Sequence, residues 1–231
     1  MAIKKRPVSP RQKMINLMYV VLMAMLALNV STEVLNGFSI VEESIGRTAA
    51  NVSKENQVIY DDFEAQLKAN PAKVKEWFDK AQAVRRMSDS LFNLADELKI
   101  AIVKEADGED GDVKNIEAKD NLEAANQVML APGRGRGGEL YNAINSFRNR
   151  ILAMIDDSAQ KQIISSNLST SIPANAVTMG KNWQEYMFED MPVAGAVTLL
   201  TKLQSDVRYA EGEVLHKLVS NIDLKDIRVN S

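Results

Sequence analysis

Apolar residues recur along most of this chain at spacings of three and four, the period of an α-helix with one buried face. The clearest series lie at residues 74–102 and 196–218, and the second repeats in a heptad-like way. Strand-type alternation is nearly absent before residue 222. The pattern therefore predicts an all-α fold, a helical bundle. The two series are Val74, Trp77, Phe78, Ala81, Val84, Met87, Leu91, Leu94, Leu98 and Ile102, then Ala196, Leu199, Leu203, Val207, Ala210, Val214 and Leu218.

The boundaries of the helices follow from breaks in this pattern. The helical spacing between residues 34 and 67 predicts a helix that runs on from the apolar N-terminal segment, with bends at Gly37 and Gly46. A new helix is expected at Asn70-Pro71, because proline suits the first helical position. We expect further helices over residues 117–130 and 140–154, and a polar loop over 165–175. Residues 222–229, within IDLKDIRVN, predict an extended segment that leads into further domains of a longer protein.

Residues 14–30 are almost entirely apolar, and only Asn16 and Asn29 are plainly polar. A helix of that length rises roughly 25 Å, slightly less than the ~30 Å hydrocarbon core. A cleaved signal peptide would also have the basic leader, but no clean small-x-small cleavage site is present. The helical period also continues past the apolar run. We therefore predict an uncleaved, single transmembrane helix, with Ser9 as the cap before Pro10.

The distribution of charge predicts the topology. Five of the 28 basic residues precede Met14, no acidic residue occurs before Glu33, and the remainder carries 23 basic against 31 acidic residues. A short basic flank stays in the cytoplasm, and the acidic remainder argues against nucleic acid as a partner. We predict a cytoplasmic leader at 1–13 and a transmembrane helix at 14–30. A helical bundle at 31–221 would lie on the opposite side of the membrane from the leader, and a linker or strand would start at 222–231.

Three motifs could indicate binding or catalysis, and each has a simpler interpretation. Gly133–Gly138 reads GRGRGG, but no strand is expected before it, so a basic loop is favoured over a phosphate site. Asp107–Asp112 lacks the ligand spacing of an EF-hand. His216 is the only histidine and the chain has no cysteine. We therefore expect no catalytic residue, no metal, no cofactor and no enzyme activity. Whether either loop contacts a partner stays open.

Arg11 has two interpretations. In the ordinary one, its side chain reaches the headgroups and helps to fix topology, and the residues alone favour this. In the other, the short span draws Arg11 inward, where a charge costs at least ~2.5–3.5 kcal/mol unless it meets an opposite charge. Arg11 shares a broad helix face with Tyr19. The predicted membrane helix contains no acid, so the opposite charge would come from another subunit.

Two stretches carry a resemblance to a known family. PRQKMINLMY, from Pro10, and ALNVS-x-EVL, at Ala27–Leu35, are similar to the start of the GldM (PorM) family of Bacteroidota. The resemblance implies a first periplasmic domain that is an α-helical bundle, followed in the family by β-rich domains. It also implies a bacterial inner-membrane location, with the N-terminus in the cytoplasm.

The resemblance further implies a role in gliding motility and type IX secretion. Family members form a homodimer whose two membrane helices thread a ring, thought to be a pentamer, of the polytopic GldL (PorL) protein. The complex is a motor driven by the proton gradient, and its periplasmic part acts on outer-membrane components. The family's membrane arginine corresponds to Arg11, which is thought to pair with a partner glutamate, and Tyr19 is a weaker candidate for that interface.

The residues alone also allow other functions. A single-span sensor with a helical ectodomain, or a scaffold that ties a complex to the membrane, would have a similar pattern. A sensor of that kind usually has a second span, and no second apolar run follows Val30. Co-purification with a multi-span partner at unequal stoichiometry would separate a motor subunit from both alternatives.

Overall fold

The structure, a computed structural model, describes residues 10–11, 13–18 and 30–229. All the regular structure in this part of the chain is helical, which confirms the predicted all-α class. None of the described helices is both long and apolar enough to cross a membrane. Residues 19–29, which form most of the predicted span, lie outside the described part.

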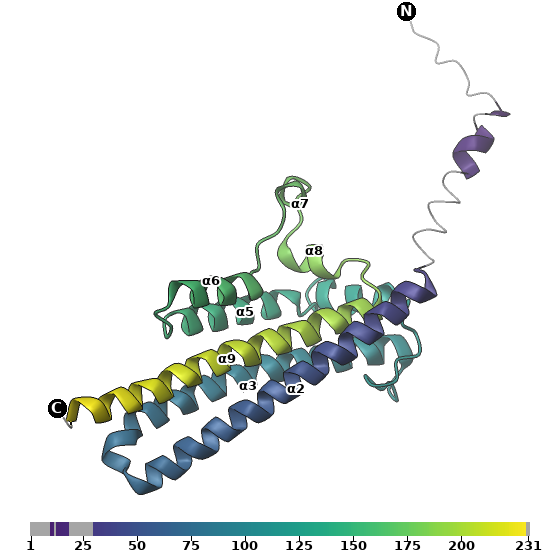
Figure 1. Cartoon of the computed structure of the whole chain (residues 1–231). Helices are drawn as coiled ribbons and strands as arrows, with labels where there is room; N and C mark the ends of the chain where they lie inside the picture. Colours follow the sequence, from purple (N-terminus) through teal and green to yellow (C-terminus); the bar gives the residue numbers. More distant parts are fainter. Residues whose placement is uncertain (1–9, 12, 19–29, 230–231) are drawn as a thin grey trace, which may run out of the picture.

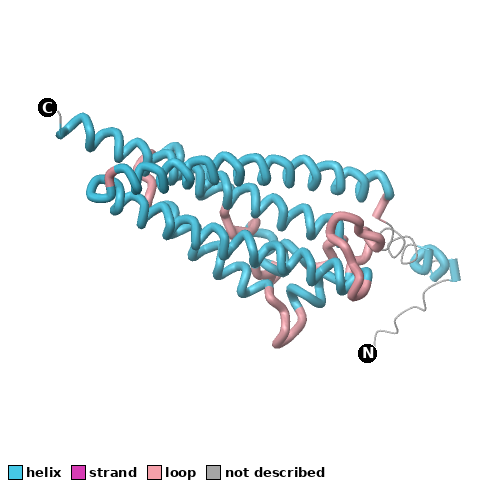
Figure 2. The backbone as a smooth tube through the Cα atoms, turned by 90° about the horizontal axis from the view of Figure 1, so that it is seen from below, coloured by secondary structure: helices cyan, strands magenta, loops and turns pink. Residues whose placement is uncertain are grey.

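Three long helices form the main body, which we call the rod: α2 (Thr32–Ala69), α3 (Pro71–Asp107) and α9 (Val193–Val229). α9 packs against both of the others along its length. Helices α2 and α9 run in the same direction, because residue numbers increase together in the pairs that contact across them. Asn56 contacts Arg208, and Tyr60 contacts Glu211. Helix α3 is antiparallel to both. As a result, α2 begins at one end of the rod and α9 finishes at the other (Figures 1 and 2).

The starts of α2 and α3 are set by local side chains. The Ser31 hydroxyl accepts a hydrogen bond from the Val34 amide at 3.2 Å, and Asn70 caps α3 in the same way, immediately before Pro71. Such caps satisfy amides that a helix leaves free at its start. The predicted break at Asn70-Pro71 is confirmed. The helix expected to run on from the N-terminal segment is interrupted, because Val30 and Ser31 are not helical.

Shorter helices connect α3 to α9 and form a side layer (Figure 1). α5 packs on α3, and α6 and α8 pack on α5. The helices expected over 117–130 and 140–154 are present with shifted bounds, and the loop expected over 165–175 is partly helical. The side layer consists of α4 (Glu123–Ala125), the π-helix η1 (Asn126–Leu130), α5 (Gly137–Leu152), α6 (Ser158–Asn167), α7 (Ala174–Thr178) and α8 (Trp183–Phe188).

The two apolar series predicted from the sequence form the core. In α3, Val84 and Leu98 are completely buried, and in α9 so are Val207 and Val214. The extended segment predicted at residues 222–229 is wrong, because α9 continues through it to Val229. Ile222 continues the helical stripe and is 1% exposed, so burying it at this spacing outweighs the alternating pattern that follows.

Candidate functional site

The two residues predicted to act in the membrane are only partly covered by the structure. Arg11 lies in a helical segment and its side chain is exposed. Tyr19 lies outside the described residues. The expected pairing of Arg11 with a carboxylate of another subunit stays a prediction.

A buried cluster of charged residues joins all three long helices at one level of the rod. The hydroxyl of Tyr60 (α2) donates a hydrogen bond of 2.7 Å to Oε1 of Glu211 (α9). Nη1 of Arg208 (α9) donates to Oε2 of Glu211 at 2.9 Å and to Oδ1 of Asp89 (α3) at 2.8 Å. The Arg208 guanidinium also lies over the ring of Phe92, 4.2 Å from its centroid. We call Tyr60, Asp89, Arg208 and Glu211 the Glu211 cluster.

The surroundings of the Glu211 cluster perturb its acids. Glu211 is 1% exposed, and burial raises the pKa of its carboxyl group even though Tyr60 and Arg208 act in the opposite direction. Burial also raises the pKa of Tyr60, and the neighbouring Glu211 carboxylate adds to that rise. Tyr60 therefore stays a hydrogen-bond donor across the physiological pH range. A buried charge is tolerated when its partners are fixed in place, and losing one partner is costly.

A second buried cluster joins the same three helices nearer the start of α2. Nζ of Lys99 (α3), which is 8% exposed, donates to Oε1 of Gln204 at 2.7 Å and to Oγ1 of Thr201 at 3.2 Å, both on α9. The Thr201 hydroxyl in turn donates to Oε1 of Glu42 (α2) at 2.9 Å. Asp96 lies 3.4 Å from Lys99 Nζ and accepts from Gln204 Nε2 at 2.7 Å. We call this set the Lys99 cluster.

The two clusters restrict how the long helices can move against one another. Apolar packing alone tolerates sliding, whereas each cluster satisfies its polar groups at one register. A shift of one helix along its neighbours would leave buried charges without partners, at a cost of several kcal/mol. The arrangement therefore makes the three helices a single stiff element. The helices α3 and α9, with 37 residues each, are about 55 Å long.

Sequence reasoning missed both clusters, although each left a local signal. Glu211 lies four residues after Val207 and three before Val214, so a charge occupies the buried stripe of α9. Lys99 holds the same kind of position between Ala95 and Ile102 in α3. A charge in a buried stripe indicates a partner on another helix. The identity of that partner is not encoded locally, since it is more than 100 residues away.

The two loops singled out in the sequence are both held by contacts with residues close to them in the chain. The carboxylate of Asp107 accepts hydrogen bonds from the amides of Glu117 and Ala118, and so it closes the acidic loop on itself. In the loop at residues 133–138, a Cβ on Gly135 or Gly137 would lie within 2.7 Å of the Met129 carbonyl oxygen. These glycines permit a close approach to η1, and their arrangement is not that of a phosphate loop.

Among the residues that the structure describes, His216 and the acidic side chains form no metal centre. His216 is exposed on α9. Within the described residues, no group of three or more histidine, aspartate or glutamate side chains is placed to hold a metal ion.

Comparison with known sequences supplies the family. The sequence profile described as the GldM N-terminal domain matches residues 33–221, well over half of the chain. The chain belongs to the GldM family. Its members take part in gliding motility and type IX secretion as structural components. A comparison with curated proteins finds no match.

The extent of the GldM match can be compared with the geometry. It begins at Glu33, in the first turn of α2, and reaches Asn221 in α9, so both buried clusters lie inside it. Arg11 and Tyr19 precede the matched region. The family assignment therefore covers the rod and its side layer, and the membrane residues rest on the sequence resemblance alone.

Proposed function

We propose that this chain is a subunit of an inner-membrane motor, driven by the proton gradient, that powers type IX secretion and gliding. Two copies would thread their membrane helices through a pentameric ring of GldL-type subunits, with the N-terminus in the cytoplasm and the bundle in the periplasm. The observation that carries the proposal is the rod itself. It starts directly after the predicted membrane span, and because Tyr60 lies level with Glu211, its far end at Val229 is about 69 Å from Thr32 along the axis.

The proposed coupling begins at Arg11. A partner carboxylate facing the guanidinium stays ionised, whereas one facing lipid keeps its proton. Proton entry and exit would change which carboxylate is attracted to Arg11. Five partner sites and two arginines cannot all pair at once, so each proton step would move the engaged pair around the ring.

The rod would carry that displacement outward. A helix pair that slid or bent would dissipate a small shift at the membrane. The Glu211 and Lys99 clusters oppose sliding because their buried charges have partners at one register. The far end of α9 would therefore follow the near end of α2, and would move the outer-membrane components through downstream domains.

The test is replacement of Arg11 in cells. We expect Arg11→Ala to abolish secretion and gliding at normal protein levels, and Arg11→Lys to be a poor substitute because lysine lacks the planar guanidinium. Lys13→Ala is the matched control. It removes a neighbouring positive charge of the same leader and should leave both activities intact. Normal secretion and gliding in the Arg11→Ala strain would contradict the proposal.

A further inference from the structure

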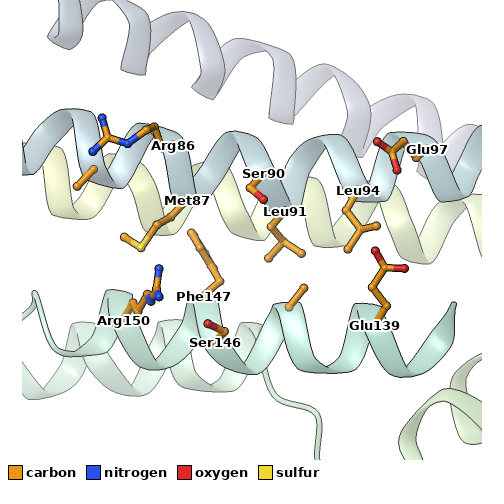
Figure 3. A pocket seen from close by; sticks show the side chains of 12 residues that line it. Arg86, Met87, Ser90, Leu91, Leu94, Glu97, Glu139, Ser146, Phe147 and Arg150 are labelled. Carbon is orange, nitrogen blue, oxygen red and sulfur yellow. The ribbon is translucent and has the colours of Figure 1, made fainter.

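An open groove runs between α3 and α5 (Figure 3), and none of its lining residues belongs to either buried cluster. Its volume is about 640 Å³, within the range of ligand-binding clefts. The floor is apolar: Leu91 and Phe147 are nearly buried, and Met87 and Leu94 are partly covered. We call it the α3–α5 groove.

The groove has charges of opposite sign at its two ends. Arg86 and Arg150 lie at one end, and Glu97 and Glu139 lie at the other (Figure 3). Each helix separates its arginine from its glutamate by 11 residues, which is about 16 Å of helix axis. The groove therefore has the length of three helical turns, with a change of sign from end to end.

The two ends also differ in how their charges are satisfied. At the acidic end, Arg136 bridges the two carboxylates: its Nη2 lies 3.2 Å from Glu97 Oε2, and its Nε lies 2.9 Å from Glu139 Oε2. At the basic end, Arg86 and Arg150 are exposed and form no ion pair within the described residues. Two guanidinium groups without acidic partners in the described part of the chain therefore flank one end of the α3–α5 groove.

We propose that the α3–α5 groove binds an amphipathic α-helix of a partner protein, about three turns long, whose carboxylates lie between Arg86 and Arg150. Apolar side chains at positions i, i+3 or i+4, and i+7 would cover Leu91 and Phe147, as in other helix-in-groove complexes. The C-terminal end of that helix would lie at the arginines, because its partial negative charge matches them. The proposal rests on α3 and α5 and is independent of the motor role.

The first experiment measures binding of a designed probe to the full chain in detergent by fluorescence anisotropy. The probe is a 14-residue amphipathic peptide with leucines at helical spacing and two glutamates in its last turn. We expect binding that weakens by at least about tenfold in the double variant Arg86→Glu, Arg150→Glu. A second peptide, with lysines in place of the two glutamates, should bind that variant better than it binds the wild type. If the wild type prefers the acidic peptide and the double variant prefers the basic one, the peptide charges pair with residues 86 and 150.

A second variant blocks the groove without changing its charge. Ser146→Trp places a large ring at the exposed rim beside Phe147. It should also weaken binding of the acidic peptide by at least about tenfold. The matched control is Arg47→Glu on α2, which reverses an exposed charge on a helix that contributes no residue to the groove lining and should leave binding unchanged. Circular dichroism of each variant confirms that it is folded.

Other results would overturn the proposal. It is wrong if the acidic peptide fails to bind, or if it binds equally to the wild type and the double variant. It is also wrong if the double variant instead loses binding to vesicles of anionic lipid, or if it changes the self-association of the chain in sedimentation. These two outcomes would assign the basic end of the groove to a membrane surface or to a second copy.

Discussion

The two sides of α3 use similar residues in different ways. On the side facing α2 and α9, Asp89 and Lys99 contribute to buried clusters in which the charges have partners. On the side facing α5, Arg86 is exposed beside an open groove, without an ion pair in the described part of the chain. Charge therefore holds the rod together on one side and remains available for recognition on the other.

The largest expected effect is on the buried side. Glu211→Ala leaves the Arg208 guanidinium with Asp89 alone and the Tyr60 hydroxyl without its acceptor. We expect the free energy of unfolding to fall by about 3–5 kcal/mol in urea titrations of the full chain. Glu43→Ala, an exposed carboxylate on α2, is the control and should change it by less than about 0.5 kcal/mol. A loss below about 1 kcal/mol for Glu211→Ala would contradict the role of the cluster.

The closeness of α2 and α9 gives a prediction of intermediate size. A Cβ on Gly212 would lie 2.8 Å from Oδ1 of Asn56, whose amide is bonded to the Arg208 carbonyl at 3.0 Å. Gly212→Ala should therefore destabilise the chain by about 1–2 kcal/mol, despite the higher helix propensity of alanine. A Cβ on Gly37 meets nothing within 4 Å, so Gly37→Ala should stabilise it by about 0.5–1 kcal/mol. Thermal unfolding of the two variants measures both effects. If Gly212→Ala and Gly37→Ala both raised the melting temperature, α2 and α9 would not be in tight contact at Gly212.

The pH dependence of stability tests the burial of Glu211 more finely. Burial raises the pKa of Glu211 in the folded chain, so the folded state binds this proton more readily than the unfolded state does. The resulting stabilisation is fully present below the unfolded pKa and is lost as pH rises through the folded pKa. Compared with Glu211→Gln, the wild type should lose stability as the pH rises above about 4, the range of an unfolded glutamate. A constant difference between the two across this window would argue against a buried carboxyl.

The smallest expected effect lies on the groove side. The double variant Arg86→Glu, Arg150→Glu should change the free energy of unfolding by less than about 1 kcal/mol, because both side chains are exposed and unpaired within the described residues. The same urea titration measures it beside Glu211→Ala. A loss as large as that of Glu211→Ala would mean that both sides of α3 serve stability, and the comparison would fail.

The sequence predicted the long helices because their signals are local. The repeats in α3 and α9, and the Asn70-Pro71 start, each lie within one element. The short helices α6 and α7 were missed because little of each is buried: Ile164 in α6 and Ala176 in α7 are the buried residues there. Helix α8 was missed because its six residues are too few to show a helical period. Residues 222–229 were misassigned because an alternating pattern overlaps the end of a helical one.

The candidate sites were harder to predict than the fold. The Glu211 and Lys99 clusters and the α3–α5 groove each depend on residues brought together from separate helices. A sequence shows that a charge lies in a buried stripe, but not which helix supplies its partner. Conversely, Arg11 and Tyr19 came from a motif resemblance, and Tyr19 lies outside the described residues.

The central claim is that α2, α3 and α9 move as one body, and double electron–electron resonance tests it most directly. The chain has no cysteine, so spin labels can be attached at Ile40→Cys on α2 and Ser220→Cys on α9, both exposed. Tyr60 pairs with Glu211, and a rise of 1.5 Å per residue then separates the labelled positions by about 43 Å along the rod. We predict one narrow distance distribution near that value in the full chain in detergent. A broad or multi-peaked distribution would contradict the account, because helices that slide or bend could not carry a displacement from one end to the other.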